Sequence, residues 1–293
     1  MAVNVEMWKP NIVEKLFADN SFMLRAVNAD EYVIGGSLVH IPQAGEPTET
    51  LINNTTYPVT VVNRQDTDVI YALDEFIKRP NRISDIDKKE LSYDKRASVI
   101  RTEMNSLIED AGSWMLYRWL NNVPNAPTHR VATTGAVGAG GLKVMTEADV
   151  LAAQLLFNKQ NIPAKGRVLL LDTDHEGQLR GDDKLKYAFQ QVVSLPNGVI
   201  GRLHGFDIYT RSSVLKINGA GAVKVPNALA AGTDKAVSAF YQEDCVERAL
   251  GQIDVFDNER RAEYYGDVIS FLLRNGGRHN RQDLKGFGLI VPA

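Results

Sequence analysis

The chain has 293 residues, of which 44% are hydrophobic and 24% are charged, and its formal net charge is −3. This length suits one large domain or two ordinary ones, and the composition is that of a globular protein rather than a disordered or fibrous one. The small negative charge argues against a dedicated nucleic-acid binder, and the single Cys245 excludes an intrachain disulfide. No apolar stretch approaches the ~20 residues of a membrane helix, and residues 1–10 show no signal-peptide pattern, so we expect a protein of a reducing cytoplasm.

The first third of the chain predicts an arm and a long hairpin. Residues 10–27 carry apolar side chains at helical spacing and predict a short amphipathic helix. Residues 33–41 and 59–73 are rich in β-branched residues and predict strands, and the polar segment 42–58 forms the tip between them. Because an isolated hairpin is marginal in water, this one either becomes ordered on a neighbouring subunit or remains a flexible surface hairpin.

The strongest single element is a helix predicted over residues 86–121, which Ser84 or Asp87 can cap and Pro124 follows. Apolar residues recur in it at three- and four-residue spacing. They are Ile100, Met104, Leu107, Ile108, Ala111, Trp114 and Met115. Its ~35 residues would span ~50 Å, which suits a flattened subunit better than a compact sphere.

The first half of this predicted helix is basic. Its cationic residues are Lys88, Lys89, Lys95, Arg96 and Arg101. Acidic residues alternate with them, so we interpret the segment as a solvated face with ion pairs between residues four positions apart, rather than as a nucleic-acid contact.

The rest of the chain predicts an α+β body. A Gly/Ala/Thr-rich linker at 125–141 precedes a helix at 146–160 that Thr146 caps. Residues 167–171 predict a buried strand, and residues 199–214 predict two strands around the turn Leu203-His204-Gly205-Phe206. The remaining predicted elements are a helix at 182–193 and strands at 236–242, 262–273 and 286–291. This order indicates an α+β class with a mixed or antiparallel sheet.

Four potential metal ligands stand close together at the end of a predicted strand: Asp172, Asp174, His175 and Glu176. A metal-dependent hydrolase could use such groups. Ligands so close in sequence rarely all face one point, so we favour a polar strand-to-helix turn capped by Asp or Thr. The glycine run 134–141 lacks the terminal Gly-Lys-Ser/Thr of a phosphate loop. We therefore assign no catalytic residue, no cofactor-binding residue and no metal ligand, and we expect no enzyme.

Four segments carry a resemblance to a known family. The closest is Gly198-Val199-Ile200-Gly201-Arg202-Leu203-His204-Gly205-Phe206-Asp207-Ile208, whose glycines suit tight turns and close strand approach. The others are Gly36-Ser37-Leu38-Val39-His40-Ile41-Pro42, Val69-Ile70-Tyr71-Ala72-Leu73-Asp74 and Arg167-Val168-Leu169-Leu170-Leu171-Asp172. With the order arm, hairpin, long helix, α+β body and strand-rich C-terminus, nearly the whole chain resembles the major capsid proteins of tailed bacteriophages, the Hong Kong 97-type coat fold.

The resemblance implies an N-terminal arm at 1–34, an extended hairpin (E-loop) at 35–78, a peripheral domain with the spine helix at 79–143 and 255–293, and an axial domain at 144–254. It implies a major capsid protein that self-assembles through pentamers and hexamers into an icosahedral shell around double-stranded DNA. The hairpin would lie over one neighbour and the arm would reach another.

The same resemblance implies a location in the virion, assembly in the host cytoplasm, a separate scaffolding protein and a portal as partners, and non-specific contact with the packaged DNA. No membrane partner is implied. The alternatives are an encapsulin-like compartment shell, a tail or adaptor component of a virion, and the metal-dependent hydrolase considered above.

Overall fold

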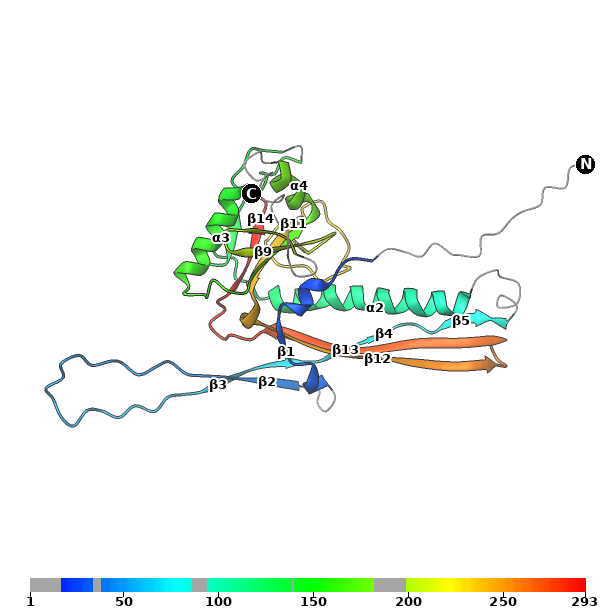
Figure 1. Cartoon of the computed structure of the whole chain (residues 1–293), viewed down its shortest axis with the longest axis horizontal. Coiled ribbons are helices and arrows are strands. Elements are labelled where there is room, and N and C mark those ends of the chain that lie inside the picture. The colour runs from blue at the N-terminus through cyan, green and yellow to red at the C-terminus, as the bar shows by residue number, and fades with distance from the viewer. Residues whose placement is uncertain (1–16, 34–37, 86–93, 139, 182–198) are drawn as a thin grey trace, which may run out of the picture.

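The computed structural model describes residues 17–33, 38–85, 94–138, 140–181 and 199–293. They form a rounded body, a long flat sheet beneath it with one helix lying along it, and a hairpin that projects in the direction opposite to the sheet (Figure 1). Within these described ranges, no helix is long and apolar enough to cross a membrane.

The flat sheet has five strands. In spatial order they are β1 (Val27–Asn28), β12 (Val246–Arg261), β13 (Gly266–His279) and, both on the outer edge of β13, β4 (Asp74–Ile77) and β5 (Asn81–Ser84). Helix α2 (Lys95–Leu120) lies on one face, where its Leu107 and Ala111 pack with Ile269 and Phe271 of β13. The helix and the sheet thus form one elongated two-layer plate.

The start of α2 differs from the predicted one. Its N-cap is Asp94, whose carboxylate accepts a hydrogen bond from the N–H of Ala97 at 3.1 Å. A carboxylate at this position satisfies one of the free N–H groups of the first turn. Ser84, one of the two predicted caps, belongs to β5, and the other, Asp87, lies in the segment 86–93, outside the described residues.

The body contains a mixed seven-stranded sheet. In spatial order its strands are β6 (Arg130–Ala132), β14 (Phe287–Val291), β11 (Lys235–Gln242), β7 (Arg167–Asp172), β9 (Phe206–Arg211) and β8 (Val199–Leu203), with β10 (Leu215–Ile217) also paired to β11. One face packs on the C-terminal half of α2 through Trp119. The other is covered by α3 (Glu147–Lys159) and α4 (Thr173–Gly181), through Phe157 and Leu179. The predicted α+β class with a mixed sheet is confirmed.

Three local predictions in the body are confirmed. Thr146 caps α3 in a reciprocal capping box, in which its backbone N–H donates to the Asp149 carboxylate at 2.8 Å. All residues of β7 are buried, as predicted for 167–171. The turn between β8 and β9 places His204 and Gly205 at φ values of 48° and 79°, the left-handed region that a two-residue hairpin turn requires.

Other predicted elements differ or lie outside the described residues. Of the helix predicted over 10–27, the described residues 17–27 contain no α-helix; they form a 3-10 turn, η1 (Ser21–Leu24), and reach the first residue of β1. Two further 3-10 turns are η2 (Asp30–Val33) and η3 (Glu243–Cys245). Strand β12 was not predicted, and the strand predicted at 262–273 begins later, because residues 262–265 form the turn from β12 to β13. The helix predicted at 182–193 lies outside the described residues.

The sheets also divide the chain differently from the predicted domain boundaries. β14 and β6 fall in ranges assigned to the peripheral domain, yet both are strands of the body sheet, and β12 begins inside the range assigned to the axial domain. The cause is long-range pairing, because the chain leaves the flat sheet after β13 and returns to the body to pair with β11. The predicted linker 125–141 is likewise tied into the body, since Gly135 N–H donates to the Val144 carbonyl at 3.1 Å.

Candidate assembly surfaces

The projecting hairpin is fixed to the rest of the chain at its root. Its two antiparallel strands are β2 (Leu38–Gln43) and β3 (Thr67–Ala72). Gln43 Nε2 donates to the Asn280 carbonyl at 2.7 Å, and Thr67 Oγ1 forms a hydrogen bond with Gln282 Oε1 at 2.6 Å. The root is therefore fastened to the segment that leaves the flat sheet after β13.

A buried hydrogen bond adds a second fastening. Tyr71 of β3 donates from its hydroxyl to Glu247 Oε1 of β12 at 2.8 Å, and both side chains are buried. Burial raises the pKa of Glu247, and the hydrogen bond from Tyr71 acts in the opposite direction. Val33, Val39 and Ala249 complete a small apolar cluster around Tyr71. This packing fixes the direction in which the hairpin leaves the flat sheet.

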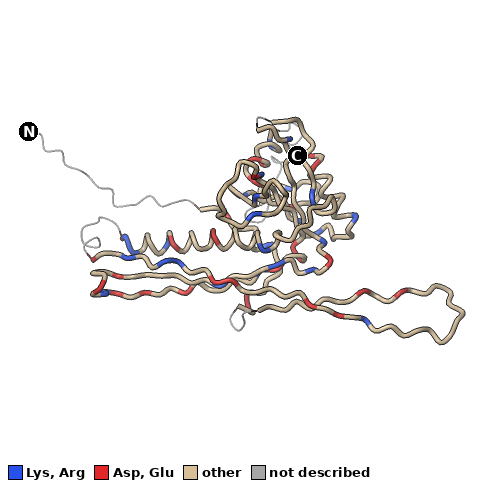
Figure 2. The backbone as a smooth tube through the Cα atoms, turned by 180° about the vertical axis from the view of Figure 1, so that it is seen from behind, with Lys and Arg blue, Asp and Glu red and all other residues tan. Residues whose placement is uncertain are grey.

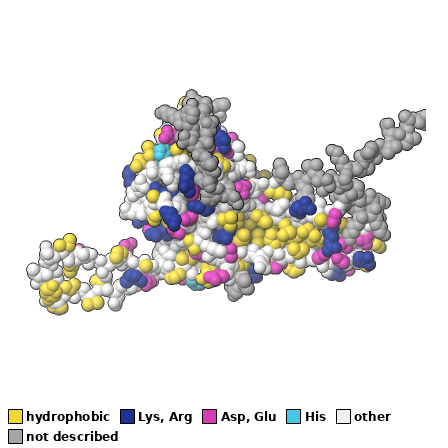
Figure 3. Space-filling model, viewed as in Figure 1, with side chains coloured by type: hydrophobic (Ala, Val, Ile, Leu, Met, Phe, Trp, Pro, Cys, Tyr) yellow, Lys and Arg dark blue, Asp and Glu magenta, His cyan; other side chains and the backbone are white. Residues whose placement is uncertain are grey.

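Beyond the root, residues 44–66 contain no strand, and many of their apolar side chains lie in water. The large exposed ones are Leu51, Ile52, Tyr57, Val59, Val61 and Val62. Ile52 is 83% exposed and Val61 is 89% exposed. Figure 3 shows hydrophobic side chains gathered toward the free end of the hairpin. Isolated exposed apolar residues are ordinary, but a group of this size in one segment marks an interaction site.

A second apolar surface lies at the opposite end of the flat sheet, where β12 turns into β13 (Figure 1). In that turn Tyr265 is 78% exposed and Tyr264 is about half exposed. Phe256 is also exposed, and it follows Val255, whose cross-strand partner Phe271 packs under α2. Because successive side chains in a strand alternate between faces, Phe256 points to the face of the sheet that α2 leaves uncovered.

The two surfaces differ in composition and lie at opposite ends of the subunit's long axis (Figure 1). Figure 2 shows the same layout from behind, with the hairpin and the turn between β12 and β13 at opposite ends of the backbone. A contact between unlike surfaces of two copies is heterologous, so each copy can give its hairpin to one neighbour and receive that of another. Contacts of this kind close into rings when the rotation between copies permits.

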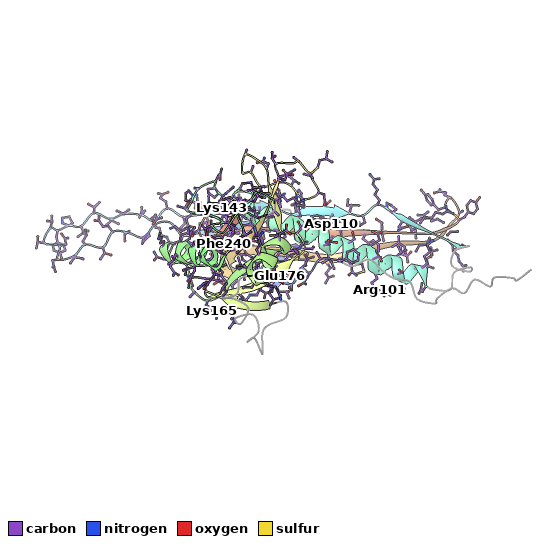
Figure 4. All side chains as sticks on the ribbon, turned by 90° about the horizontal axis from the view of Figure 1, so that it is seen from above. Arg101, Asp110, Lys143, Lys165, Glu176 and Phe240 are labelled. Carbon is purple, nitrogen blue, oxygen red and sulfur yellow. The ribbon has the colours of Figure 1, made fainter. Side chains whose placement is uncertain are left out.

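The basic start of α2 is engaged within the chain. Arg96 forms ion pairs with Asp257 and, at 2.9 Å, with Glu259 of β12. Figure 4 shows Arg101 and Asp110 projecting from different places along α2. Lys88 and Lys89 lie outside the described residues. Arg96 is thus ion-paired, but with β12 and not with a residue four positions away on the helix, as was expected.

The acidic cluster after β7 does not converge on one point. Its His175 faces the interior, with Nδ1 at 2.7 Å from Ser238 Oγ, and burial lowers the pKa of this imidazole. Asp172 accepts hydrogen bonds from the N–H groups of Asp174 and Val214, both at 3.3 Å. In the part of the chain that the structure describes, no group of three or more His, Cys, Asp or Glu side chains could hold a metal ion. These contacts support the strand-to-helix turn.

Sequence reasoning located the hairpin but missed the second surface. It placed Tyr264 and Tyr265 inside a strand, whereas both lie in a turn in which Tyr265 has a φ of 48°. Gly266 directly after them is a local signal for a turn. The contact between Tyr71 and Glu247 joins residues 176 positions apart and has no local signal.

No protein-family model and no curated protein matches the chain. Solved structures do match over almost its whole length. The capsid of Ralstonia phage GP4 is 13% identical, with a TM-score of 0.71, and the match covers 99% of this chain and 94% of that chain. A structure from Mycobacterium phage Che8 is 19% identical, with a TM-score of 0.69, and the match covers 99% of this chain and 97% of that chain. The capsid structure of Cyanophage P-SCSP1u is 14% identical, with a TM-score of 0.69, and the match covers 99% of this chain and 93% of that chain. The fold expected from the sequence is confirmed: this chain has the Hong Kong 97-type fold of tailed-bacteriophage capsid proteins.

Proposed function

We propose that this chain is the major capsid protein of a tailed bacteriophage, and that it self-assembles into an icosahedral shell around double-stranded DNA. The observation that carries the proposal is the pair of unlike apolar surfaces at opposite ends of the subunit's long axis, in a chain whose whole length has a capsid fold. This role is structural and needs no catalytic residue.

Assembly in this proposal is driven by burial of the hairpin on a neighbouring copy. Each large apolar side chain that moves from water into an interface contributes up to about 1.5–3 kcal/mol. In the isolated chain Ile52 and Val61 gain little of this stabilisation, because both are more than four-fifths exposed. Repetition of one heterologous contact gives pentamers and hexamers, and these close into the shell.

The parts of the chain take the roles implied by the family. Residues 1–34 act as the arm, residues 35–78 as the E-loop, and α2 as the spine helix of a peripheral domain that includes the flat sheet. The seven-stranded body acts as the axial domain. Supported by the strand pairings, we place β6 and β14 in the axial domain and the whole of β12 in the peripheral one.

The further partners are a separate scaffolding protein, a portal, and packaged DNA held by salt-sensitive contacts that do not depend on base sequence. In this proposal the shell assembles in the host cytoplasm and is located in the virion.

The test is electron microscopy of the purified chain beside a variant without the hairpin tip. In the variant, Asn-Gly replaces residues 46–64 and joins Gly45 to Gln65, whose backbones already lie in contact. We expect rings or closed shells from the parent, and unassembled subunits with an unchanged circular-dichroism spectrum from the variant. Normal shells from the variant would exclude the hairpin as the assembly contact.

The contents of the parent's shells decide between two kinds of shell. Shells formed beside the other virion proteins should contain DNA. Shells that enclose a co-purifying enzyme instead would indicate an encapsulin-like compartment and would contradict the phage assignment.

A further inference from the structure

One apolar surface belongs neither to the hairpin nor to the turn between β12 and β13. Figure 3 shows it as a continuous band of hydrophobic side chains along α2 and the strands beneath it. Ile108 of α2 is 37% exposed and Val255 of β12 is 46% exposed. Ile100, Met104 and Ile253 beside them are only partly buried. We call these five residues the α2–β12 band.

The band follows from the periodicities of its two elements. Ile100, Met104 and Ile108 recur every four residues, so they lie along one flank of α2. Val255 pairs with Phe271 of β13, which packs under the helix, so the side chain of Val255 lies on the same face of the sheet as α2. The helix covers the centre of that face and leaves the β12 side of it open.

The first described residues of the chain, from residue 17 on, lie next to this band. Asn20 Nδ2 donates to the carbonyl of Ile108 at 2.9 Å. Gly112 allows that approach, since a Cβ there would lie 2.4 Å from Asn20 Oδ1. Phe22 then packs edge-on against Trp119 with ring centroids 5.9 Å apart. Residue 20 is therefore fixed at one end of the band.

The sequence just before this point has matching apolar side chains. Trp8, Ile12 and Leu16 recur every four residues, and Val13 adjoins them. At no more than ~3.6 Å per residue, Leu16 lies within ~15 Å of the fixed Asn20. Such a tether gives the segment a high effective concentration at the band, which a segment from another copy does not have.

We propose that residues 8–16 dock on the α2–β12 band of their own chain, with Trp8, Ile12, Val13 and Leu16 against Ile100, Met104, Ile108, Ile253 and Val255. This intrachain contact replaces the expectation that the start of the arm reaches another copy. It does not depend on the proposed function, because it exists in a single unassembled subunit.

The first test is a disulfide between two introduced thiols, in a chain freed of its own thiol by Cys245→Ala. Ile12→Cys is combined with Met104→Cys, and the control combines Ile12→Cys with Leu155→Cys, an exposed position of α3 on the other side of the body. After mild oxidation with oxidised glutathione, we expect most Met104→Cys chains to lose two hydrogen atoms in mass and to close into a loop within one chain. The control should remain reduced or link only between chains.

Two results of this test would overturn the proposal. One is a Met104→Cys pair that oxidises no faster than the control pair. The other is a link that joins only differently isotope-labelled chains, which would assign the band to a neighbouring copy.

A second measurement covers the case in which the cysteine variants fold poorly. Removal of residues 1–16 should increase the fluorescence of a dye that binds exposed apolar surface, and Ile108→Ser with Val255→Ser in the shortened chain should abolish the increase. Unchanged dye fluorescence after the removal would show that these residues do not cover the band.

Discussion

The body and the projecting hairpin use their apolar side chains in opposite ways. In the body, Phe240 is fully buried with its ring centroid 5.1 Å from that of Phe157 and 6.3 Å from that of Phe206. In the hairpin, Ile52 and Val61 are more than four-fifths exposed. Both regions carry large apolar side chains, and the difference lies in whether other parts of the same chain cover them.

This difference separates folding from assembly. The body buries its largest apolar side chains within one subunit. The hairpin holds its apolar surface out on a fixed root and can bury it only on something else. The flat sheet lies between these extremes, because α2 covers only the centre of one face and leaves Phe256 exposed on the other. Substitutions in the three regions should therefore divide between effects on stability and effects on assembly.

The largest effect on stability is expected for Phe240→Ala. The change removes a buried ring between Phe157 and Phe206 and leaves a cavity, which costs about 3–5 kcal/mol. Urea denaturation of unassembled subunits measures the loss in the free energy of unfolding. A loss below ~1 kcal/mol would mean that the body is loosely packed at Phe240, and the contrast between body and hairpin would then fail.

The parts of the body that were predictable from the sequence are those governed by local chemistry. The capping box of Thr146 and Asp149 is a four-residue signal, and the turn at His204-Gly205 is a two-residue one. The uninterrupted apolar run of β7 predicts a strand buried on both faces. The hairpin itself was predictable because two β-branched segments flank a polar one.

The missed elements depend on partners far away in the sequence. β12 ends in Asn258-Glu259-Arg260-Arg261, which has no apolar alternation and is a strand because β13 pairs with it. Arg96 and its acidic partners on β12 likewise give no pattern within either element. The strand β14 was predicted, but its pairing with β11 in the body sheet depends on the long-range order of the strands, for which the segment itself carries no signal. For the same reason the second assembly surface was missed, since it exists only where β12 and β13 meet.

An intermediate effect is expected at the hairpin root for Tyr71→Phe. The change removes the hydrogen bond to Glu247 and leaves a buried carboxylate without that donor, which costs about 1–3 kcal/mol. The loss should depend on pH. Burial raises the pKa of Glu247 above its ordinary 4.5, so the folded state loses stability as pH rises through the raised value and the carboxylate becomes charged. The hydrogen bond from Tyr71 limits that loss because it lowers the pKa of Glu247. The difference in free energy of unfolding between the parent and the Tyr71→Phe variant should therefore grow as pH rises.

Denaturation of both proteins across a pH series checks this expectation. Groups other than Glu247 titrate in both proteins. The difference between their two curves of unfolding free energy against pH therefore isolates the contribution of the Tyr71–Glu247 hydrogen bond. We expect the smallest difference in the free energy of unfolding well below pH 4.5, where Glu247 is protonated in both the folded and the unfolded state. A difference that stays constant with pH would contradict the role given to this carboxylate.

The smallest effect on stability is expected for Ile52→Ser, at the hairpin tip. Ile52 is 83% exposed, so its replacement should change the free energy of unfolding by no more than about 0.5 kcal/mol. The same change removes apolar area from the proposed interface, so it should reduce the yield of shells in sedimentation and electron microscopy. Leu229→Ser is the matched control, because Leu229 is 94% exposed on the loop between β10 and β11 and offers no projecting segment. Equal losses of shells in the two variants would mean that overall surface hydrophobicity drives assembly. A loss for Ile52→Ser alone, at unchanged stability, would show that the hairpin serves a neighbouring copy rather than its own chain.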